Sequence, residues 1–206
     1  IIEDLVPFKK ELATTIARNK SGQIEIFPIV EMMFNEVSNQ VEYVLCPAQI
    51  SSEINEKAKK IALKVSESFK QVGLLAVEMF LTHDNKILIN EVAPRPHNSA
   101  HYSIESCINS QFDQHINSIL DLPLGSSKSN FYAIMINLVG ELGHEGKVVY
   151  EGIKEAMLIE NTKLHLYGKS KTKPNRKMGH ATVLDSNLEN ALKKAKKIKE
   201  LVKVKT

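Results

Sequence analysis

The chain has no tryptophan and only two cysteines, and none of its apolar runs is long enough to span a bilayer. Cys46 and Cys107 stand in unrelated contexts without metal-ligand spacing, so we expect reduced thiols. No signal-peptide pattern opens the chain. These absences argue against a disulfide-rich secreted scaffold, a cysteine-ligated metal centre and a membrane protein, and they predict a cytoplasmic location.

The chain also lacks a strong excess of charge of either sign. It has 27 Lys or Arg against 24 Asp or Glu, and a formal net charge of +3 is too small to predict a nucleic-acid partner. The lysines between residues 193 and 199 lie mostly off the apolar face of a helix predicted at 188–202. They could form a patch for RNA or membranes, but a solvated helix surface is the interpretation that we prefer.

The apolar pattern predicts an α+β fold, with an antiparallel sheet and packed helices followed by a small β-rich module. Strands are predicted at 11–18, 24–27 and 41–45, and a helix runs from a cap at Ser51 or Ser52 to Gly73. A second helix carries six apolar residues on one face: Ile104, Ile108, Phe112, Ile116, Ile119 and Leu120.

A polar link at 126–130 predicts a boundary between two domains, 1–125 and 126–206. In the second domain we expect strands at 133–139, 157–159 and 163–167 before the terminal helix. At 206 residues the chain can bury a substantial core in this arrangement.

The segment from Leu74 to His101 is the most informative part of the chain. Two apolar runs flank an Asp84-Asn85 turn, which predicts a β-hairpin. With the turn centred between these two residues, Glu78 falls directly opposite Glu91, with Cβ atoms roughly 4.5–5.5 Å apart. Two such carboxylates repel each other, and a hard divalent cation such as magnesium would relieve the conflict. The alternative is a solvated face on which the two carboxylates simply turn apart.

The residues that follow Glu91 bring cationic and polar groups close to this pair. Arg95 offers a planar fork of donors suited to carboxylate, bicarbonate or phosphate. Ser99 could cap a following helix, whose free N–H groups would bind an anion. An anion site next to a cation site is therefore one interpretation, and a surface loop stiffened by Pro94 and Pro96 is the other.

These residues resemble a known family. Glu78, Asn90-Glu91 and the run from Ala93 to His101 are similar to the signature of the 5-(carboxyamino)imidazole ribonucleotide synthases, ATP-grasp enzymes of de novo purine (IMP) biosynthesis. A pair of glutamates would fit any ATP-grasp enzyme, but PRPHNSAH followed by SQF points to this one. The resemblance covers nearly the whole chain and continues at 110–112, His115, 122–124, 135–138, 165–169 and 176–180.

The chain departs from the family pattern in two ways. The family usually has Arg-Pro-Gly-Arg-Lys where this chain has Lys173-Pro174-Asn175-Arg176-Lys177, so the charge is kept and a glycine is lost. The resemblance also implies that the chain is the C-terminal half of the enzyme, namely the C-terminal part of an ATP-grasp domain and the β-rich module. The N-terminal domain and the lid with its two ATP-binding lysines would be absent, so we expect this chain to be inactive alone.

The resemblance implies roles in nucleotide and metal binding. Backbone groups of Glu3 and Val6 would bind the adenine edge of ATP, and Glu11 would accept hydrogen bonds from its ribose. Glu78 and Glu91 would hold magnesium, with assistance from Asn90.

The resemblance also implies the residues that act on the other substrates. Arg95, His97, Asn98 and Ser99 would line a pocket for bicarbonate and carboxyphosphate. In the second domain, Lys169 would act in catalysis and, with Arg176 and Lys177, would hold the ribonucleotide phosphate or the bicarbonate; a merely solvated basic loop is the alternative.

The implied function is ATP-dependent carboxylation of 5-aminoimidazole ribonucleotide with bicarbonate by a carbon–nitrogen ligase, a cytoplasmic homodimer when full length. Its partners would be these small molecules, with no nucleic acid or membrane. Another ATP-grasp carboxylase or ligase, and a non-catalytic module derived from one, remain the alternatives.

Overall fold

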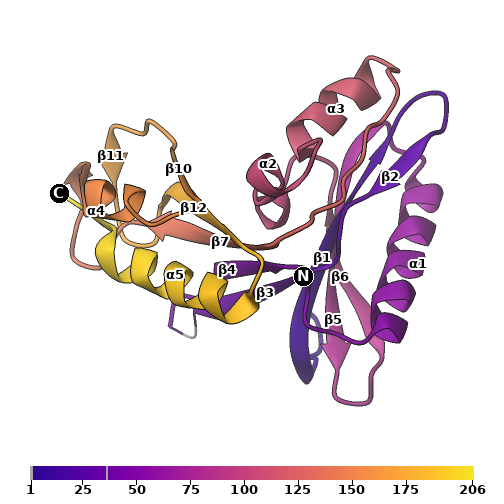
Figure 1. The fold of residues 1–206 in the computed structure, drawn as a ribbon. Helices are drawn as coiled ribbons and strands as arrows, with labels where there is room; N and C mark the ends of the chain where they lie inside the picture. Colours follow the sequence, from indigo (N-terminus) through magenta and orange to yellow (C-terminus); the bar gives the residue numbers. More distant parts are fainter. Residues whose placement is uncertain (1, 36) are drawn as a thin grey trace. The chain divides into compact units, whose positions relative to one another are not determined.

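The structure is a computed structural model and describes residues 2–35 and 37–206. The chain forms two compact units (Figure 1), and each is described here by itself. Unit 1 holds residues 1–33 and 45–130, and unit 2 holds residues 34–44 and 131–206. The domains predicted at 1–125 and 126–206 differ from these units mainly in one place, because the segment 34–44 joins the C-terminal unit. Among the described residues no helix is long and apolar enough to cross a membrane.

Unit 1 is built on an antiparallel sheet around its longest strand, β1 (Phe8–Arg18). This strand pairs with β2 (Ile24–Ile26), with β3 (Val30–Asn35) and with β5 (Gly73–Thr82), which in turn pairs with β6 (Ile87–Ala93). The predicted strands at 11–18 and 24–27 are confirmed, whereas β3 was not predicted from the sequence.

Helix α1 (Ser52–Phe69) lies on one face of this sheet (Figure 1). Ser51, one of the two predicted caps, begins it by accepting a hydrogen bond from the Ile54 backbone N–H at 3.3 Å. The helix ends at Lys70, which takes the left-handed conformation (φ 49°), so the prediction that Gly73 ends the helix is wrong. Gly73 instead begins β5.

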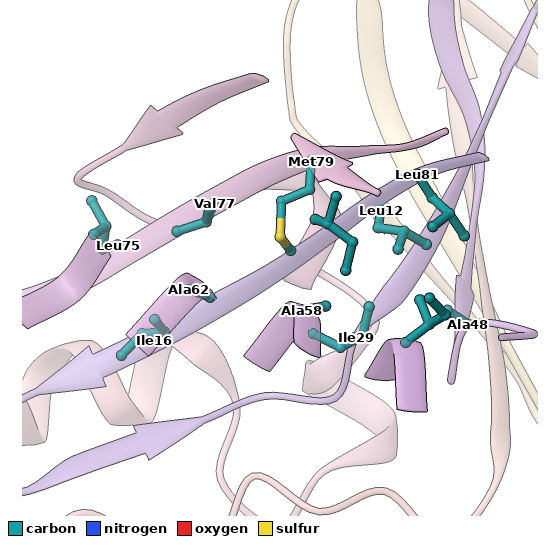
Figure 2. Close-up of a cluster of buried hydrophobic side chains, with 12 residues drawn as sticks. Leu12, Ile16, Ile29, Ala48, Ala58, Ala62, Leu75, Val77, Met79 and Leu81 are labelled. Atoms are coloured by element: carbon teal, nitrogen blue, oxygen red, sulfur yellow. The ribbon is translucent and has the colours of Figure 1, made fainter. Parts of the chain in front are cut away.

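The core of unit 1 lies between α1 and the sheet (Figure 2). Alternate residues of β1 and β5 point toward the helix, because side chains alternate between the two faces of a strand. The helix contributes small residues at a spacing of four, which allows close packing. The labelled members of this cluster are Leu12, Ile16, Ile29, Ala48, Ala58, Ala62, Leu75, Val77, Met79 and Leu81.

The opposite face of the same sheet is covered by shorter elements. These are η1 (Asn98–Ala100), α2 (Ser103–Ser106) and α3 (Gln111–Ile119), of which α2 and α3 are labelled in Figure 1. The single helix with one apolar face that the sequence predicted here is therefore wrong. Helix α3 buries polar side chains, Gln111, Gln114 and Ser118. The predicted apolar face is largely exposed: Ile108, Phe112, Ile116, Ile119 and Leu120.

Unit 2 contains an antiparallel sheet in which β12 (Lys177–Asp185) lies between β10 (Thr162–Leu166) and β7 (Tyr132–Val139). Strand β7 is bordered in turn by β4 (Gln40–Cys46). Four short strands form two small sheets: β8 (Gly146–Lys147) with β11 (Lys171–Thr172), and β9 (Val149–Glu151) with β13 (Lys203–Lys205).

Two helices complete unit 2. Helix α5 (Leu188–Leu201) confirms the predicted terminal helix, and its apolar residues Ala191, Ala195 and Ile198 are buried as expected. The strand predicted at 157–159 is wrong, because α4 (Ile153–Met157) begins after Gly152 and continues to the first of these residues. The α+β class and the β-rich character of the second unit are confirmed.

Candidate functional site

The hairpin of β5 and β6 contains a β-bulge at the predicted pair of carboxylates. Near the turn, Met79 pairs with Ile89, whereas beyond the bulge Val77 pairs with Val92. One residue of β5, Glu78, therefore faces two residues of β6, Asn90 and Glu91. The predicted one-to-one register is wrong near the turn and correct beyond the bulge.

The turn explains this difference in register. Leu81 pairs with Ile87, so the loop is centred on Asp84 rather than between Asp84 and Asn85. The Lys86 ammonium and the Thr82 hydroxyl both contact the Asp84 carboxylate and lower its pKa to about 2. Asn85 takes the left-handed conformation (φ 61°), which asparagine tolerates better than most residues.

The bulge brings three potential ligand groups together. One ligand atom each from Glu78, Glu91 and His97 lies within 4.8 Å of the other two, and this is the only such group of three among the described residues. The side chains of His97 and Glu78 are only 12% and 14% exposed, and the Nε2 atom of His97 lies 3.4 Å from the Oε1 atom of Glu78. The structure thus brings the two predicted metal ligands together and adds a histidine predicted for another role.

The hydrogen bonds of His97 indicate its tautomer. Its Nδ1 atom accepts from the Ser99 backbone N–H at 3.4 Å, and the Ser99 hydroxyl lies 2.9 Å from the same nitrogen. A nitrogen that accepts carries no proton, so the neutral ring has its proton on Nε2, directed toward Glu78. His97 can therefore orient the Glu78 carboxylate by donating to it.

Two carboxylates at this distance meet the requirements of a hard divalent cation. Magnesium prefers oxygen ligands and is commonly bound through one or two carboxylates together with substrate phosphates. Glu91 is exposed and Glu78 is partly buried, so an ion held by both would remain open to a phosphate on one side. The donor set fits magnesium.

The loop after β6 differs from its prediction in one respect. Ser99 does not cap a helix: it lies inside η1, a short 3-10 helix whose cap is His97. A segment this short offers no helix N-terminal anion site, so that part of the prediction is wrong. Ser99 is buried, whereas Arg95 is exposed and donates from Nη1 to the Pro96 carbonyl at 3.1 Å.

The candidate nucleotide residues lie at the start of unit 1. Glu3 and Val6 belong to an irregular segment that precedes β1. Glu11 lies on β1 opposite Phe80, and Ala13, two residues along, lies opposite Glu78. Because side chains alternate, Glu11 and Glu78 share the face of the sheet that α1 does not cover. Partial burial raises the pKa of Glu11.

The candidate substrate residues lie together in unit 2. Lys169 donates from Nζ to the Lys177 carbonyl, and its ammonium lies 5.5 Å from the centre of the Tyr167 ring. Arg176 is held by a hydrogen bond of 3.0 Å from Nη1 to the Lys171 carbonyl. The structure therefore brings Lys169 and the segment 176–177 into contact.

Tyr167, which lies beside Lys169, contacts one of two stacked histidines, and the sequence predicted no role for these three residues. The Tyr167 hydroxyl lies 3.0 Å from the Nδ1 atom of His180, and burial raises the pKa of Tyr167 to about 12. The rings of His165 and His180, which are partners in the β10–β12 ladder, stack at 4.5 Å. The alternating His-Leu-Tyr pattern of a strand could have indicated that His165 and Tyr167 share a face.

The missing glycine in the basic loop has a structural replacement. Asn175 stands at the position of the family glycine and takes the left-handed conformation (φ 62°). Its backbone N–H donates to the Gly140 carbonyl at 2.9 Å. Asparagine is one of the few residues that reach this conformation without a large cost, so the loop keeps a glycine-like turn.

The sequence predicted no role for Gln111, a buried residue near the cluster, although it belongs to the SQF motif. Gln111 is 0% exposed and forms hydrogen bonds with both backbone groups of His97. Its position within the SQF motif, ten residues after His101, is the only signal that the sequence offered.

Two family models match successive parts of the chain. The ATP-grasp domain model matches residues 1–112, and the model of the phosphoribosylaminoimidazole carboxylase C-terminal domain matches residues 133–194. The N5-carboxyaminoimidazole ribonucleotide synthase of Bacillus subtilis is 41% identical over 184 residues, which are 89% of this chain and 46% of that protein.

Solved structures of related proteins have the same fold. The N5-carboxyaminoimidazole ribonucleotide synthetase of Thermotoga maritima is 46% identical, with a TM-score of 0.92 over 99% of this chain and 54% of its own. The synthase of Aspergillus clavatus in complex with ADP and 5-aminoimidazole ribonucleotide is 34% identical, with a TM-score of 0.84 over 95% of this chain and 52% of its own. The chain spans about half the length of these relatives.

Proposed function

The chain belongs to the ATP-grasp family. On that premise we propose that it supplies the residues with which a carbon–nitrogen ligase binds metal and bicarbonate. The reaction is the ATP-dependent carboxylation of 5-aminoimidazole ribonucleotide with bicarbonate, a step of purine biosynthesis. The names of the relatives and the matched C-terminal domain support this choice over other ATP-grasp reactions.

The observation that carries the proposal is the cluster of Glu78, Glu91 and His97 at the bulge, within 4.8 Å of one another. In this proposal Glu78 and Glu91 hold magnesium, and Asn90 assists from the same bulge. A magnesium ion lowers the repulsion between phosphate oxygens and an incoming anion and polarises the phosphoryl group that is transferred. Glu3, Val6 and Glu11 bind the adenine and ribose of ATP.

Bicarbonate is a poor electrophile until it is phosphorylated to carboxyphosphate. In this proposal Arg95, His97, Asn98 and Ser99 surround the anion. The planar guanidinium of Arg95 suits two oxygens of bicarbonate or of carboxyphosphate, and its exposure leaves it accessible to a substrate. A positioned donor of this kind stabilises the negative charge that develops in the transition state.

The basic residues of unit 2 bind the acceptor in this proposal. The Lys169 ammonium stabilises the negative charge of bicarbonate or of the ribonucleotide phosphate. Arg176 and Lys177 hold the phosphate of the ribonucleotide. The contacts of Lys169 with the Lys177 carbonyl and the Tyr167 ring support its placement, because they restrict a long and otherwise flexible side chain.

On the family resemblance alone, we also propose that the complete protein is a homodimer that acts in the cytoplasm, without a nucleic-acid or membrane partner. Analytical ultracentrifugation of the complete protein measures this state directly, and a monomer at micromolar concentration contradicts it.

The experiment that tests the function is a chimera in which this chain replaces the matching segment of the Thermotoga maritima synthetase. We expect ADP formation that requires both bicarbonate and 5-aminoimidazole ribonucleotide. ADP formation with a different amine acceptor would support another ATP-grasp ligase, and a folded chimera without any turnover would support a non-catalytic module.

A further inference from the structure

Gln111 is buried in a helix whose polar side faces inward. It is the first residue of α3 and is 0% exposed. Glutamine is seldom fully buried unless its amide is satisfied, because a buried polar group without partners costs free energy. The partners of this amide therefore indicate what the residue is for.

The side-chain amide of Gln111 binds both backbone groups of His97. Its Oε1 atom accepts from the His97 N–H at 2.8 Å, and its Nε2 atom donates to the His97 carbonyl at 3.0 Å. A backbone N–H only donates and a carbonyl only accepts, so the orientation of the amide is fixed. The same Nε2 atom lies 2.7 Å from the Nδ1 atom of His101. Three of the four hydrogen-bonding positions of the Gln111 amide are therefore used.

The helix itself is fixed to the same loop. The Gln111 backbone N–H donates to the Ser103 hydroxyl at 2.9 Å, and that hydroxyl donates to the Ala100 carbonyl. Ser110 caps α3 and completes a capping box with Asp113. The start of α3 is thus a rigid support for the segment that carries His97.

The chain contains a second clamp of the same kind, three residues further along α3. The Gln114 amide donates to the Gly125 carbonyl and accepts from the Gly125 N–H at 3.2 Å. Gln114 is also 0% exposed. The two residues match in type, burial, helix and number of backbone bonds, but only Gln111 holds a residue of the carboxylate cluster.

We propose that Gln111 is a positioning residue of the site: its amide fixes the His97 backbone so that the imidazole Nε2–H points at Glu78. The expected effect of Gln111 on turnover rests on the proposed function. Its expected effect on the position of His97 rests on geometry alone. Outer residues that orient a ligand of a metal commonly change activity 10- to 100-fold when they are mutated.

The test compares Gln111→Met with Gln114→Met, since methionine has a similar length and cannot form either clamp. In the chimera we expect both variants to lose similar thermal stability. Only Gln111→Met should lower kcat, by about 10- to 100-fold, with little change in KM for ATP because the adenine and ribose residues are untouched. Equal kcat values in the two variants would overturn the proposal.

A second measurement does not depend on turnover. In the 206-residue chain labelled with 15N-histidine, at a pH where the His97 ring is neutral, its proton should be on Nε2. Gln111→Met should shift its ring nitrogen signals toward an average of tautomers, and Gln114→Met should leave them unchanged. Unchanged His97 signals in Gln111→Met would refute the clamp, whereas an inactive wild-type chimera with the expected shifts would refute only the proposed function.

Discussion

The two faces of the unit 1 sheet are covered by helices of opposite character. Helix α1 turns apolar residues, Ile54, Ala58 and Ala62, toward the sheet. Helix α3 turns Gln111, Gln114 and Ser118 inward and leaves apolar side chains exposed. One sheet therefore supports the larger hydrophobic core on one face. The other face carries a network of hydrogen bonds beside a small apolar cluster of Ala17, Leu74 and Leu124.

The difference shows how a β-strand can serve stability and chemistry at once. In β5, Leu75, Val77 and Met79 belong to the core, while Glu78 between them points to the other face. Hydrophobic packing tolerates small adjustments, whereas hydrogen bonds fix distance and direction. The face with the polar helix is the one on which a defined arrangement of carboxylates and histidine can be held.

The largest effect should come from the core face. Leu75 is 0% exposed, so Leu75→Ala should destabilise the 206-residue chain by about 2–5 kcal/mol in urea unfolding. The control is Leu88→Ala in the same hairpin, where the side chain is 41% exposed and the loss should be much smaller. Equal losses of unfolding free energy at both positions would contradict the placement of Leu75 in the core.

The next effect should appear in turnover and not in stability. Arg95→Lys in the chimera should lower bicarbonate-dependent ADP formation by about 100-fold or more, roughly 3 kcal/mol, because lysine keeps the charge but not the planar fork. Nucleotide binding, measured separately, should change little. Arg18→Lys is the control substitution at the end of β1, and near-normal turnover in Arg95→Lys would remove Arg95 from the proposed role.

A divalent cation should stabilise the folded chain only by binding to Glu78 and Glu91. Mg²⁺ or Mn²⁺ at ten times its dissociation constant should raise the unfolding free energy by about 1.4 kcal/mol in a thermal titration. Glu91→Gln should abolish this gain, whereas Glu56→Gln on the exposed surface of α1 should preserve it. A gain that survives in Glu91→Gln would place the ion elsewhere.

The smallest effect concerns the free-energy cost of partly burying the Glu11 carboxylate. Burial raises the pKa of Glu11, so its ionised form is disfavoured in the folded state, and stability falls as the pH rises through the folded pKa. Glu11→Gln should therefore stabilise the chain slightly at pH 7, by up to about 0.5 kcal/mol, and the gain should vanish in acid. A loss of stability at pH 7 would show that Glu11 has a favourable partner instead.

Much of the site could be predicted because its motif is compact in sequence. The hairpin, the closeness of Glu78 and Glu91, and the family resemblance all came from residues 74–101, and the family matches confirm the resemblance. The bulge could not be predicted, because one extra residue in a strand leaves the apolar pattern nearly unchanged while it shifts the register. The roles of the individual site residues stay predictions.

By itself the sequence determined the α+β class, a helix cap at Ser51 or Ser52, the terminal helix and the family motif. These features depend on helix-capping preferences and on the spacing of apolar side chains, and both can be read from the sequence. Only the tertiary structure decided which side of α3 faces inward and that His97 meets Glu78. Those outcomes depend on partners distant in sequence, because a buried amide is stable only where the fold supplies its hydrogen bonds.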